Sequence, residues 1–468
     1  MIALLVLAAS LAGAPVIRPL ADTGAALRYM RLNLDVTAYG VPGHGEIVID
    51  RATGSFVRRF DAGPVSEREG WDGVHAWRAD ATGMARVEGN VDERGSIVAW
   101  SRVLAPAKGG APCACGSRPP VFTVAPATGL VSAVVRYVGE QTERTTFSDY
   151  RRDGGFVVPH LLVDTSEDGT WSVRVRSVET PAVIPSTAFA PPPDPHDATI
   201  DGTVSDALLP GLPVPVLLVS VNGGAPLRFA LDTGGQNVIS PDAARRLGMQ
   251  IVGNGTVGGA GAGLVKIQYA WARTVAVGSA QMRDQPFIVL DLGKNIPFDG
   301  IIGYELLARF AVRLDFEHGR FEIAADGRAF DTPGIDVPMT LDERQPQVDG
   351  ALDGVPGTMT IDTGSESGLD VNAPFVLAHD LRAKYHAVDS GSPIAGVGGQ
   401  VHAYSARADD LRLGSVHFSD VPLLLTDADA GAEANPTVAG NVGDRLLRRY
   451  NLVLDYRRNI VRFEPPVH

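Results

Sequence analysis

The fold is decided by a stretch of seven residues that occurs twice. Residues 229–235 read Phe-Ala-Leu-Asp-Thr-Gly-Gly, and residues 359–365 read Met-Thr-Ile-Asp-Thr-Gly-Ser, with the second aspartate 130 positions after the first. A second matching pair follows in the same order, because residues 299–310 resemble residues 439–450 at an offset of 140. Two ordered pairs at nearly one offset indicate a tandem duplication of a unit of about 135 residues.

Both units repeat the same order of predicted elements. Apolar strands lead to Asp-Thr-Gly, a short helix and a glycine-rich stretch follow, and further strands lead to an apolar-Gly element. In the first unit Ser240 is expected to cap a helix over residues 241–247 that Gly248 ends. In the second unit Asn372 is expected to cap a helix over residues 373–382.

A third Asp-Thr-Gly occurs at residues 22–24 without this context. No strand-like apolar run precedes it, and no apolar-Gly element follows at the right distance. A short motif needs its context, so we interpret this copy as a turn or as the mature N-terminus.

The doubled motif resembles the aspartic peptidases of the pepsin and retropepsin type, and in particular bacterial retropepsin-like proteins that carry both lobes in one chain. The resemblance covers residues 200–466. It implies a mainly β fold with two tandem β-barrel lobes related by a pseudo-twofold axis. It also implies an aspartic endopeptidase in which Asp232 and Asp362 are the catalytic dyad. The same resemblance assigns supporting roles in the two loops to Thr233 and Thr363, whose hydroxyls lock the loops together, and to Gly234 and Gly364, which let the backbone approach the carboxylates.

The chemistry of paired carboxylates agrees with this implication. Two carboxyl groups about 3 Å apart cannot both ionise and therefore share a proton, as the dyad of aspartic proteases illustrates. The ionised member takes a proton from a bound water, and the protonated member polarises the scissile carbonyl. The sequence leaves open which aspartate plays which part. No metal or other cofactor is expected, since the ten histidines form no His-Glu-x-x-His motif.

The glycine-rich stretches are predicted to be flaps that close over a bound peptide. Either stretch alone could equally be a turn-rich loop, but their matched positions in both units favour flaps. The candidate flap residues are Gly258, Gly259, Ala260 and Gly261 in the first unit, and Gly396, Val397, Gly398 and Gly399 in the second.

Two departures from the family pattern predict an asymmetric but intact dyad. Gly235 stands where many relatives have a serine or alanine, so a hydroxyl bond to the outer carboxylate oxygen is missing in the first unit, whereas Ser365 provides a hydroxyl in the second. Asn441 replaces the apolar residue that Ile301 supplies in the first unit. We expect this change to weaken packing under the second loop but to spare the carboxylates.

Residues 30–185 show alternating apolar and polar stretches, at 45–50, 96–100 and 170–178, which predict antiparallel strands. This β-rich region is faintly similar to lipoprotein-carrier-like domains, which hold an apolar ligand on a curved sheet. It could instead be a propeptide or a module that presents substrate. A weakly active peptide-binding or carrier protein on the same scaffold remains the alternative function. We expect the tryptophans Trp71, Trp77, Trp100 and Trp171 to lie in the core of this region.

Composition bounds the remaining possibilities. The 468 residues carry a net charge of −13, which argues against a nucleic-acid or anionic-membrane binder.

Residues 1–14 are expected to be a signal peptide for export to the periplasm or the outside of a bacterial cell. Residues 186–197 are expected to be a proline-rich linker, followed by lobe 1 (198–333) and lobe 2 (334–468), which pair within a monomer that acts on a peptide or protein substrate. Cys113 and Cys115 are interpreted as incidental thiols.

Overall fold

The computed structural model describes residues 27–104, 118–138, 141–293, 296–330 and 332–466. The predictions for the signal peptide at 1–14, for the Asp-Thr-Gly at 22–24 and for the two cysteines fall outside these residues. None of the helices in the described part of the chain combines the length and the apolar character that crossing a bilayer requires.

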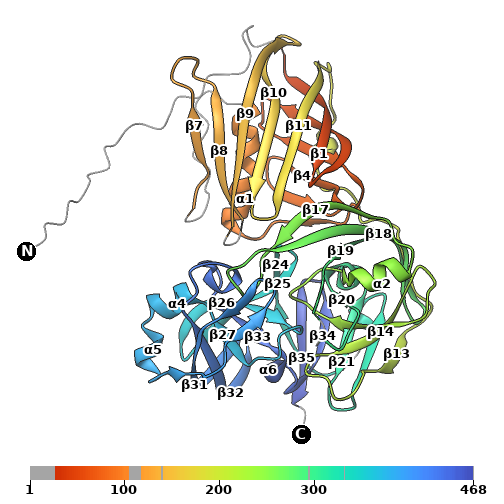
Figure 1. Cartoon of the computed structure of the whole chain (residues 1–468), viewed down its shortest axis with the longest axis vertical. Coiled ribbons are helices and arrows are strands. Elements are labelled where there is room, and N and C mark those ends of the chain that lie inside the picture. The colour runs from red at the N-terminus through yellow and green to blue at the C-terminus, as the bar shows by residue number, and fades with distance from the viewer. Residues whose placement is uncertain (1–26, 105–117, 139–140, 294–295, 331, 467–468) are drawn as a thin grey trace, which may run out of the picture.

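The N-terminal region forms one eleven-stranded sheet in which every neighbouring pair is antiparallel, in the order β6-β5-β4-β3-β2-β1-β11-β10-β9-β8-β7. Figure 1 shows this sheet standing above the rest of the molecule. Its strands are β1 (Tyr29–Ala38), β2 (Val41–Asp50), β3 (Phe56–Asp61), β4 (Glu67–Trp71), β5 (Ala76–Ala79), β6 (Ala85–Val87), β7 (Val121–Val124), β8 (Val131–Val138), β9 (Gln141–Asp153), β10 (Phe156–Ser166) and β11 (Gly169–Glu179). The segments 45–50 and 170–178 lie in β2 and β11, as predicted.

The predicted strand over residues 96–100 is wrong, because this stretch lies inside helix α1 (Val91–Leu104). The Asn90 side chain starts the helix by accepting hydrogen bonds from the backbone N–H groups of Asp92 (2.9 Å) and Glu93 (3.3 Å). Ile97 and Trp100 are buried against the sheet. A short apolar run that is buried on nearly all sides fits a strand and a helix equally well, so the pattern of residues 96–100 could not distinguish the two.

Charged side chains are buried together with the aromatic core of this domain. Arg58 pairs with Glu69 (3.0 Å), and Arg136 pairs with Asp164 (2.8 Å). Both guanidinium groups lie about 5 Å from the Trp100 ring. Trp77, Trp100 and Trp171 are buried, as predicted, and Trp71 is partly buried against the same core.

The first unit folds into a closed barrel. Six strands pair in the order β19-β16-β20-β15-β14-β18, and a further β18–β19 pairing closes the ring. The strands of this sheet are β12 (Ala198–Thr199), β14 (Val216–Val221), β15 (Leu227–Leu231), β16 (Val238–Ile239), β17 (Ile251–Val257), β18 (Val265–Val277), β19 (Ala280–Val289) and β20 (Gly300–Ile302).

The second unit closes in the same way, because β32-β27-β33-β26-β25-β31 pair in that order and β31 also pairs with β32. Its strands are β24 (Thr340–Asp342), β25 (Gln345–Leu352), β26 (Val355–Asp362), β27 (Leu369–Val371), β28 (Val388–Asp389), β31 (Ala403–Leu413), β32 (Val416–Thr426) and β33 (Gly440–Gly443). A separate hairpin is formed by β29 (Ile394–Gly396) and β30 (Gly399–Val401). The matching strand orders confirm the predicted mainly β fold of two tandem barrel lobes preceded by a β-rich domain.

A six-stranded sheet joins the two lobes at its centre, where β21 pairs with β34. The strand order is β13-β22-β21-β34-β35-β23, so each lobe contributes three neighbouring strands. These strands are β13 (Val204–Ala207), β21 (Ala311–Asp315), β22 (Arg320–Ala324), β23 (Ile335–Pro338), β34 (Tyr450–Asp455) and β35 (Ile460–Pro466). Apolar residues of both barrels and of this sheet belong to one continuous core, so the lobes are fixed relative to each other.

The short helices of the lobes follow the predicted pattern only in the first unit. Helix α2 (Pro241–Arg246) is capped by the Ser240 hydroxyl, which accepts from the Ala243 N–H (3.3 Å). The helix predicted over 373–382 is wrong as one element, because Asp380 adopts a left-handed conformation (φ 48°) between α4 (Ala373–Ala378) and α5 (Leu381–Lys384). The remaining helices are α3 (Tyr304–Leu307) and α6 (Asp444–Leu447).

The N-terminal domain lies on the first lobe, directly above β17 and β18 (Figure 1). The backbone N–H of Asn254 donates to the Tyr39 carbonyl (2.8 Å), and that of Thr256 donates to the Asp168 carbonyl (3.0 Å). The connection over residues 186–197 is packed as well, since the Trp77 indole N–H donates to the Phe189 carbonyl (2.8 Å).

Candidate active site

Each Asp-Thr-Gly loop begins where a barrel strand ends beside the apolar-Gly element of the same unit. In the first lobe, β15 pairs in parallel with β20, which places Leu231 opposite Ile302. In the second lobe, β26 pairs in parallel with β33, which places Asp362 opposite Gly443. The second motif therefore supports the first from within each barrel, although the two lie far apart in the sequence.

The two threonines connect the loops by four reciprocal hydrogen bonds. The backbone N–H of Thr233 donates to the Thr363 hydroxyl (3.1 Å), and that of Thr363 donates to the Thr233 hydroxyl (3.0 Å). Each hydroxyl in turn donates to a carbonyl of the opposite lobe, Thr233 to Ile361 (2.5 Å) and Thr363 to Leu231 (2.8 Å). Both threonines are fully buried, so the pairing fixes the separation of the loops.

The glycines after the threonines let each loop approach the carboxyl group of the other. A Cβ atom added at Gly234 would lie 2.9 Å from Cγ of Asp362, and one added at Gly364 would overlap Cγ of Asp232. Any larger residue would therefore push the loops apart. The structure thus brings Asp232 and Asp362 side by side where the lobes meet.

The two carboxyl groups differ in the donors that surround them. Asp232 accepts one hydrogen bond, from the Gly234 N–H to Oδ1 (2.7 Å). Asp362 accepts three: the N–H groups of Gly364 (2.8 Å) and Ser365 (3.1 Å) donate to Oδ1, and the Asn441 side-chain amide donates to Oδ2 (2.7 Å).

Two expectations about this loop are corrected. Asn441 does not spare the carboxylates, because its amide is a direct donor to Asp362. The Ser365 hydroxyl is not bonded to Asp362; it lies 2.9 Å from the Ser367 hydroxyl, and only the Ser365 backbone reaches the carboxylate. Asn441 takes the place that a hydroxyl was expected to fill.

Burial is the main cause that raises the pKa of Asp232 well above its usual range, and the charge of Asp362 and a hydrogen bond between the two carboxyl groups raise it further. The single Gly234 donor acts in the opposite direction but does not offset these effects. Asp232 therefore keeps its proton at a pH where an exposed aspartate is ionised.

The two glycine-rich stretches meet above the cleft. Residues 258–264 connect β17 to β18, and Val397 and Gly398 form the turn of the β29–β30 hairpin. The backbone N–H of Gly261 donates to the Val397 carbonyl (3.1 Å), and that of Gly263 donates to the Gly398 carbonyl (2.9 Å). An alanine Cβ at position 261 would overlap the backbone of Gly398, which explains why the contact uses glycine.

A cavity of about 1190 Å³ extends from the two aspartates to the N-terminal domain. Its walls include both loops, both hairpin tips, and side chains of the N-terminal sheet such as Arg58 and Glu67. The cavity also reaches into the second lobe, where Asp370 and Glu433 line it. Neither of these two acids belongs to a motif that the sequence predicted.

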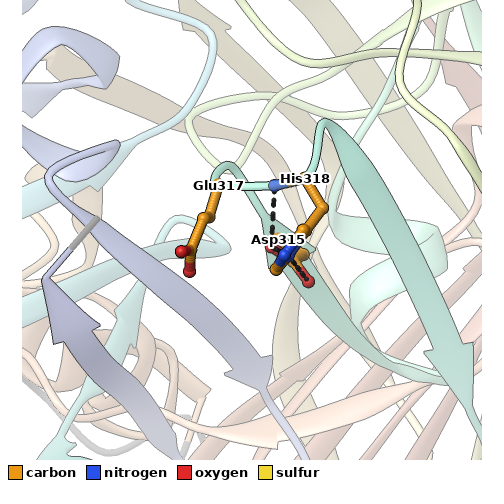
Figure 2. Close-up of side chains that lie close together, drawn as sticks. All are labelled: Asp315, Glu317 and His318. Atoms are coloured by element: carbon orange, nitrogen blue, oxygen red, sulfur yellow. Dashed lines mark hydrogen bonds and ion pairs between the residues drawn. The ribbon is translucent and has the colours of Figure 1, made fainter. Parts of the chain in front are cut away.

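Two groups of side chains in the described part of the chain have potential metal-ligand atoms close together. Figure 2 shows one of them, Asp315, Glu317 and His318, in the turn between β21 and β22. Both oxygens of Asp315 lie within 3.0 Å of His318 Nδ1, and Arg313 also donates to Oδ2 (3.1 Å). These bonds show that the three side chains lie close together because they stabilise the turn of a β-hairpin.

The second group joins Glu88 and Glu93 of the N-terminal domain to Asp342 of lobe 2. Arg78 donates to Glu93 (3.0 Å), and the Asn90 and Gln347 amides each donate to Asp342 (3.0 Å). Protein donors thus reach Glu93 and Asp342 at the contact between the domain and the lobe, although Glu93 Oε1 and Asp342 Oδ1 have no hydrogen-bond partner among the described residues.

Comparisons with known proteins agree with this geometry. An aspartyl protease family model matches the chain twice, over residues 217–306 and 348–446, which contain the two Asp-Thr-Gly loops. No curated protein sequence matches the chain. Among solved structures, the chain is similar to the aspartic proteinase from Irpex lacteus, at 12% identity and a TM-score of 0.40, over 57% of this chain and 98% of that one. So distant a likeness adds nothing to what the doubled family match and the two barrels show. Residues 217–306 and 348–446 thus match the aspartyl protease family, and both matched lobes lie in one polypeptide.

Proposed function

We propose that the chain is an aspartic endopeptidase whose catalytic dyad is Asp232 and Asp362. The observation that carries the proposal is the reciprocal threonine pairing, which holds the two carboxyl groups side by side at one end of a large cavity. The size of that cavity and the two hairpin tips above it favour an extended peptide bound in mid-chain over a chain end.

The unequal donor sets support an assignment of the shared proton. Three N–H donors stabilise the ionised form of Asp362, whereas Asp232 has one donor and a raised pKa. In the free enzyme Asp362 is then the base and Asp232 the acid.

Hydrolysis follows from this assignment. Asp362 takes a proton from a water that attacks the scissile carbonyl, while Asp232 donates its proton to the carbonyl oxygen to give a neutral tetrahedral diol. Asp362 then passes the proton it gained to the amide nitrogen, the C–N bond breaks, and a diol hydroxyl proton returns to Asp232. The dyad regains its starting state, and water has been added across the peptide bond.

The test is replacement of each aspartate by asparagine, assayed on a peptide library from acidic to neutral pH. We expect Asp232→Asn and Asp362→Asn each to lose at least about 10³-fold in kcat, with peptides still bound. Asp242→Asn removes an exposed carboxylate on α2 and should leave kcat unchanged. Full activity in either dyad variant would refute the proposed mechanism.

The carrier-type alternative is not favoured. An apolar ligand needs an apolar surface, whereas the cavity wall of the N-terminal domain carries Arg58, Glu67 and Glu69. A protein that only binds peptides has no need for a paired, buried carboxyl group with a raised pKa.

A further inference from the structure

A pair of buried acids lies beside Asp362 on the lobe 2 side of the cleft. Asp370 is 2% exposed in the middle of β27, and Glu433 is 5% exposed in the one-turn segment Ala432–Ala434. Both line the cavity that contains the dyad. The equivalent position in lobe 1 is occupied by Val238, so the barrel fold itself does not require an acid at this position.

Glu433 has no partner that explains its burial. Among the described residues its carboxyl group makes no hydrogen bond or ion pair, and its Oε2 atom is fully enclosed. The Ser367 hydroxyl donates to Asp370 Oδ2 (2.7 Å), and the neighbouring Ser365 hydroxyl also acts on this carboxyl group, whereas its Oδ1 atom has no hydrogen-bond partner in the described part of the chain. A buried carboxyl group without a partner destabilises a fold, so these oxygens call for a ligand.

The surroundings of this pair are built rather than incidental. The Asn372 amide donates to the carbonyls of Ala432 (3.4 Å) and Asn435 (3.3 Å), which fixes the segment that carries Glu433. The backbone N–H of Ala432 donates to the Gly259 carbonyl at the first hairpin tip (2.9 Å). Asp370 is thus tied to the loop that follows Asp362, and the segment that carries Glu433 is tied to the first hairpin tip.

We propose that Asp370 and Glu433 form a subsite for a cationic side chain, lysine or arginine, adjacent to the scissile bond. This inference rests on the proposed function and names its substrate class. A lysine or arginine side chain supplies the donors that the two carboxyl groups lack, and charge-assisted hydrogen bonds of this kind are the strong ones.

The electrostatics of the pair favour a cationic ligand. Burial raises the pKa of Asp370 to about 7 and that of Glu433 to about 8, and the charge of Asp362 adds to both effects. Without a cation the two groups hold protons near neutral pH. A bound cationic side chain replaces those protons.

The experiment compares matched peptides that differ at one position beside the scissile bond: lysine against norleucine, and arginine against citrulline. For the wild-type protein we expect kcat/KM to be at least about tenfold higher for each cationic peptide. In Glu433→Gln and in Asp370→Asn the ratio should fall toward one through loss on the cationic peptide alone. Glu317→Gln, which removes an exposed carboxylate elsewhere, should keep the wild-type ratio.

The possible failures are distinguishable. Cleavage of neutral peptides with no cationic preference, or an unchanged ratio in Glu433→Gln, overturns the subsite and leaves the protease intact. If no peptide is cleaved, the test is peptide binding: fluorescence anisotropy measures the affinity of the Asp232→Asn protein for the lysine and norleucine peptides. Tighter binding of the lysine peptide that Glu433→Gln abolishes supports the subsite without the protease. Equal binding of lysine and norleucine peptides overturns it. Thermal unfolding of each variant identifies any that fail to fold, in which case the other variant provides the test.

Discussion

At the scale of single residues, the contact between Asn441 and Asp362 makes the two halves of the proposed dyad unequal. Asn441 lies opposite Thr360 as Ile301 lies opposite Ala230, so the two positions are equivalent in the two lobes. We predict that Asn441→Val moves the acid limb of the kcat/KM profile to higher pH, because ionised Asp362 loses one of its three donors. A pH–rate profile on one peptide measures this.

The equivalent change in the other lobe provides the control. Ile301→Asn places an amide near Asp232, where it should stabilise the ionised form and move the alkaline limb to lower pH. If both variants shift the same limb, or neither shifts any, the unequal donor sets do not decide which aspartate holds the proton.

The raised pKa of Asp232 predicts the alkaline limit of the unmodified protein. A carboxyl group with a raised pKa stays protonated until the pH rises through that pKa, so the form with one proton on the dyad persists above the usual aspartate range. We therefore expect kcat/KM to be retained at weakly acidic to neutral pH and to fall as the pH rises further. Activity confined to strongly acidic pH would contradict this expectation.

The site residues differ in how far the sequence could predict them. Asp232 and Asp362 stand in a repeated motif whose context is local, so their pairing could be predicted. Asn441 is a polar residue in an apolar strand, and the rule that a polar group in such a place needs a partner points to the neighbouring carboxylate. Asp370 and Glu433 are separated by more than sixty positions and share no motif, so only the fold brings them together.

At the scale of elements, the contact between the two hairpin tips predicts which glycines the proposed flaps require. A Cβ at Gly261 would overlap the backbone of Gly398, whereas one at Gly258 meets only the flexible end of Leu264, at 3.7 Å. We predict that Gly261→Ala separates the tips and raises KM several-fold with little change in melting temperature, since both tips lie outside the barrels. Gly258→Ala is the matched control and should behave as wild type. Equal KM values for the two variants would show that the tips do not close over substrate.

The ends of helices can be predicted from capping residues and apolar periodicity, and the prediction is wrong where these signals are ambiguous. Helix α2 has a serine cap, an N-terminal proline and a terminal glycine, and it was predicted almost to the residue. The second-unit helix carries no glycine at its break, and Asp380 takes the left-handed conformation that glycine usually supplies. Helix α1 is buried nearly all round, so alternation could not identify it.

At the scale of the whole molecule, the N-terminal domain holds β17, at the base of the first proposed flap, by the backbone bonds from Asn254 and Thr256. It is also tied to lobe 1 through Arg309, which pairs with Asp197 and donates to the Thr82 hydroxyl (2.7 Å). Because these contacts do not depend on an intact connection, the domain should act as a permanent part of the cleft and not as a propeptide.

Cutting the connection tests this role directly. A specific protease site introduced within residues 191–195 allows the folded chain to be nicked between the domain and lobe 1. We predict that both fragments co-elute in size-exclusion chromatography and that kcat/KM stays within about twofold of the uncut protein with the same insertion, because the interface carries the association. A propeptide would instead dissociate and leave a more active remainder. If the domain dissociates and activity rises, a permanent role is excluded. If the domain dissociates and activity falls, the domain is needed for activity but is held in place by the covalent connection and not by the interface.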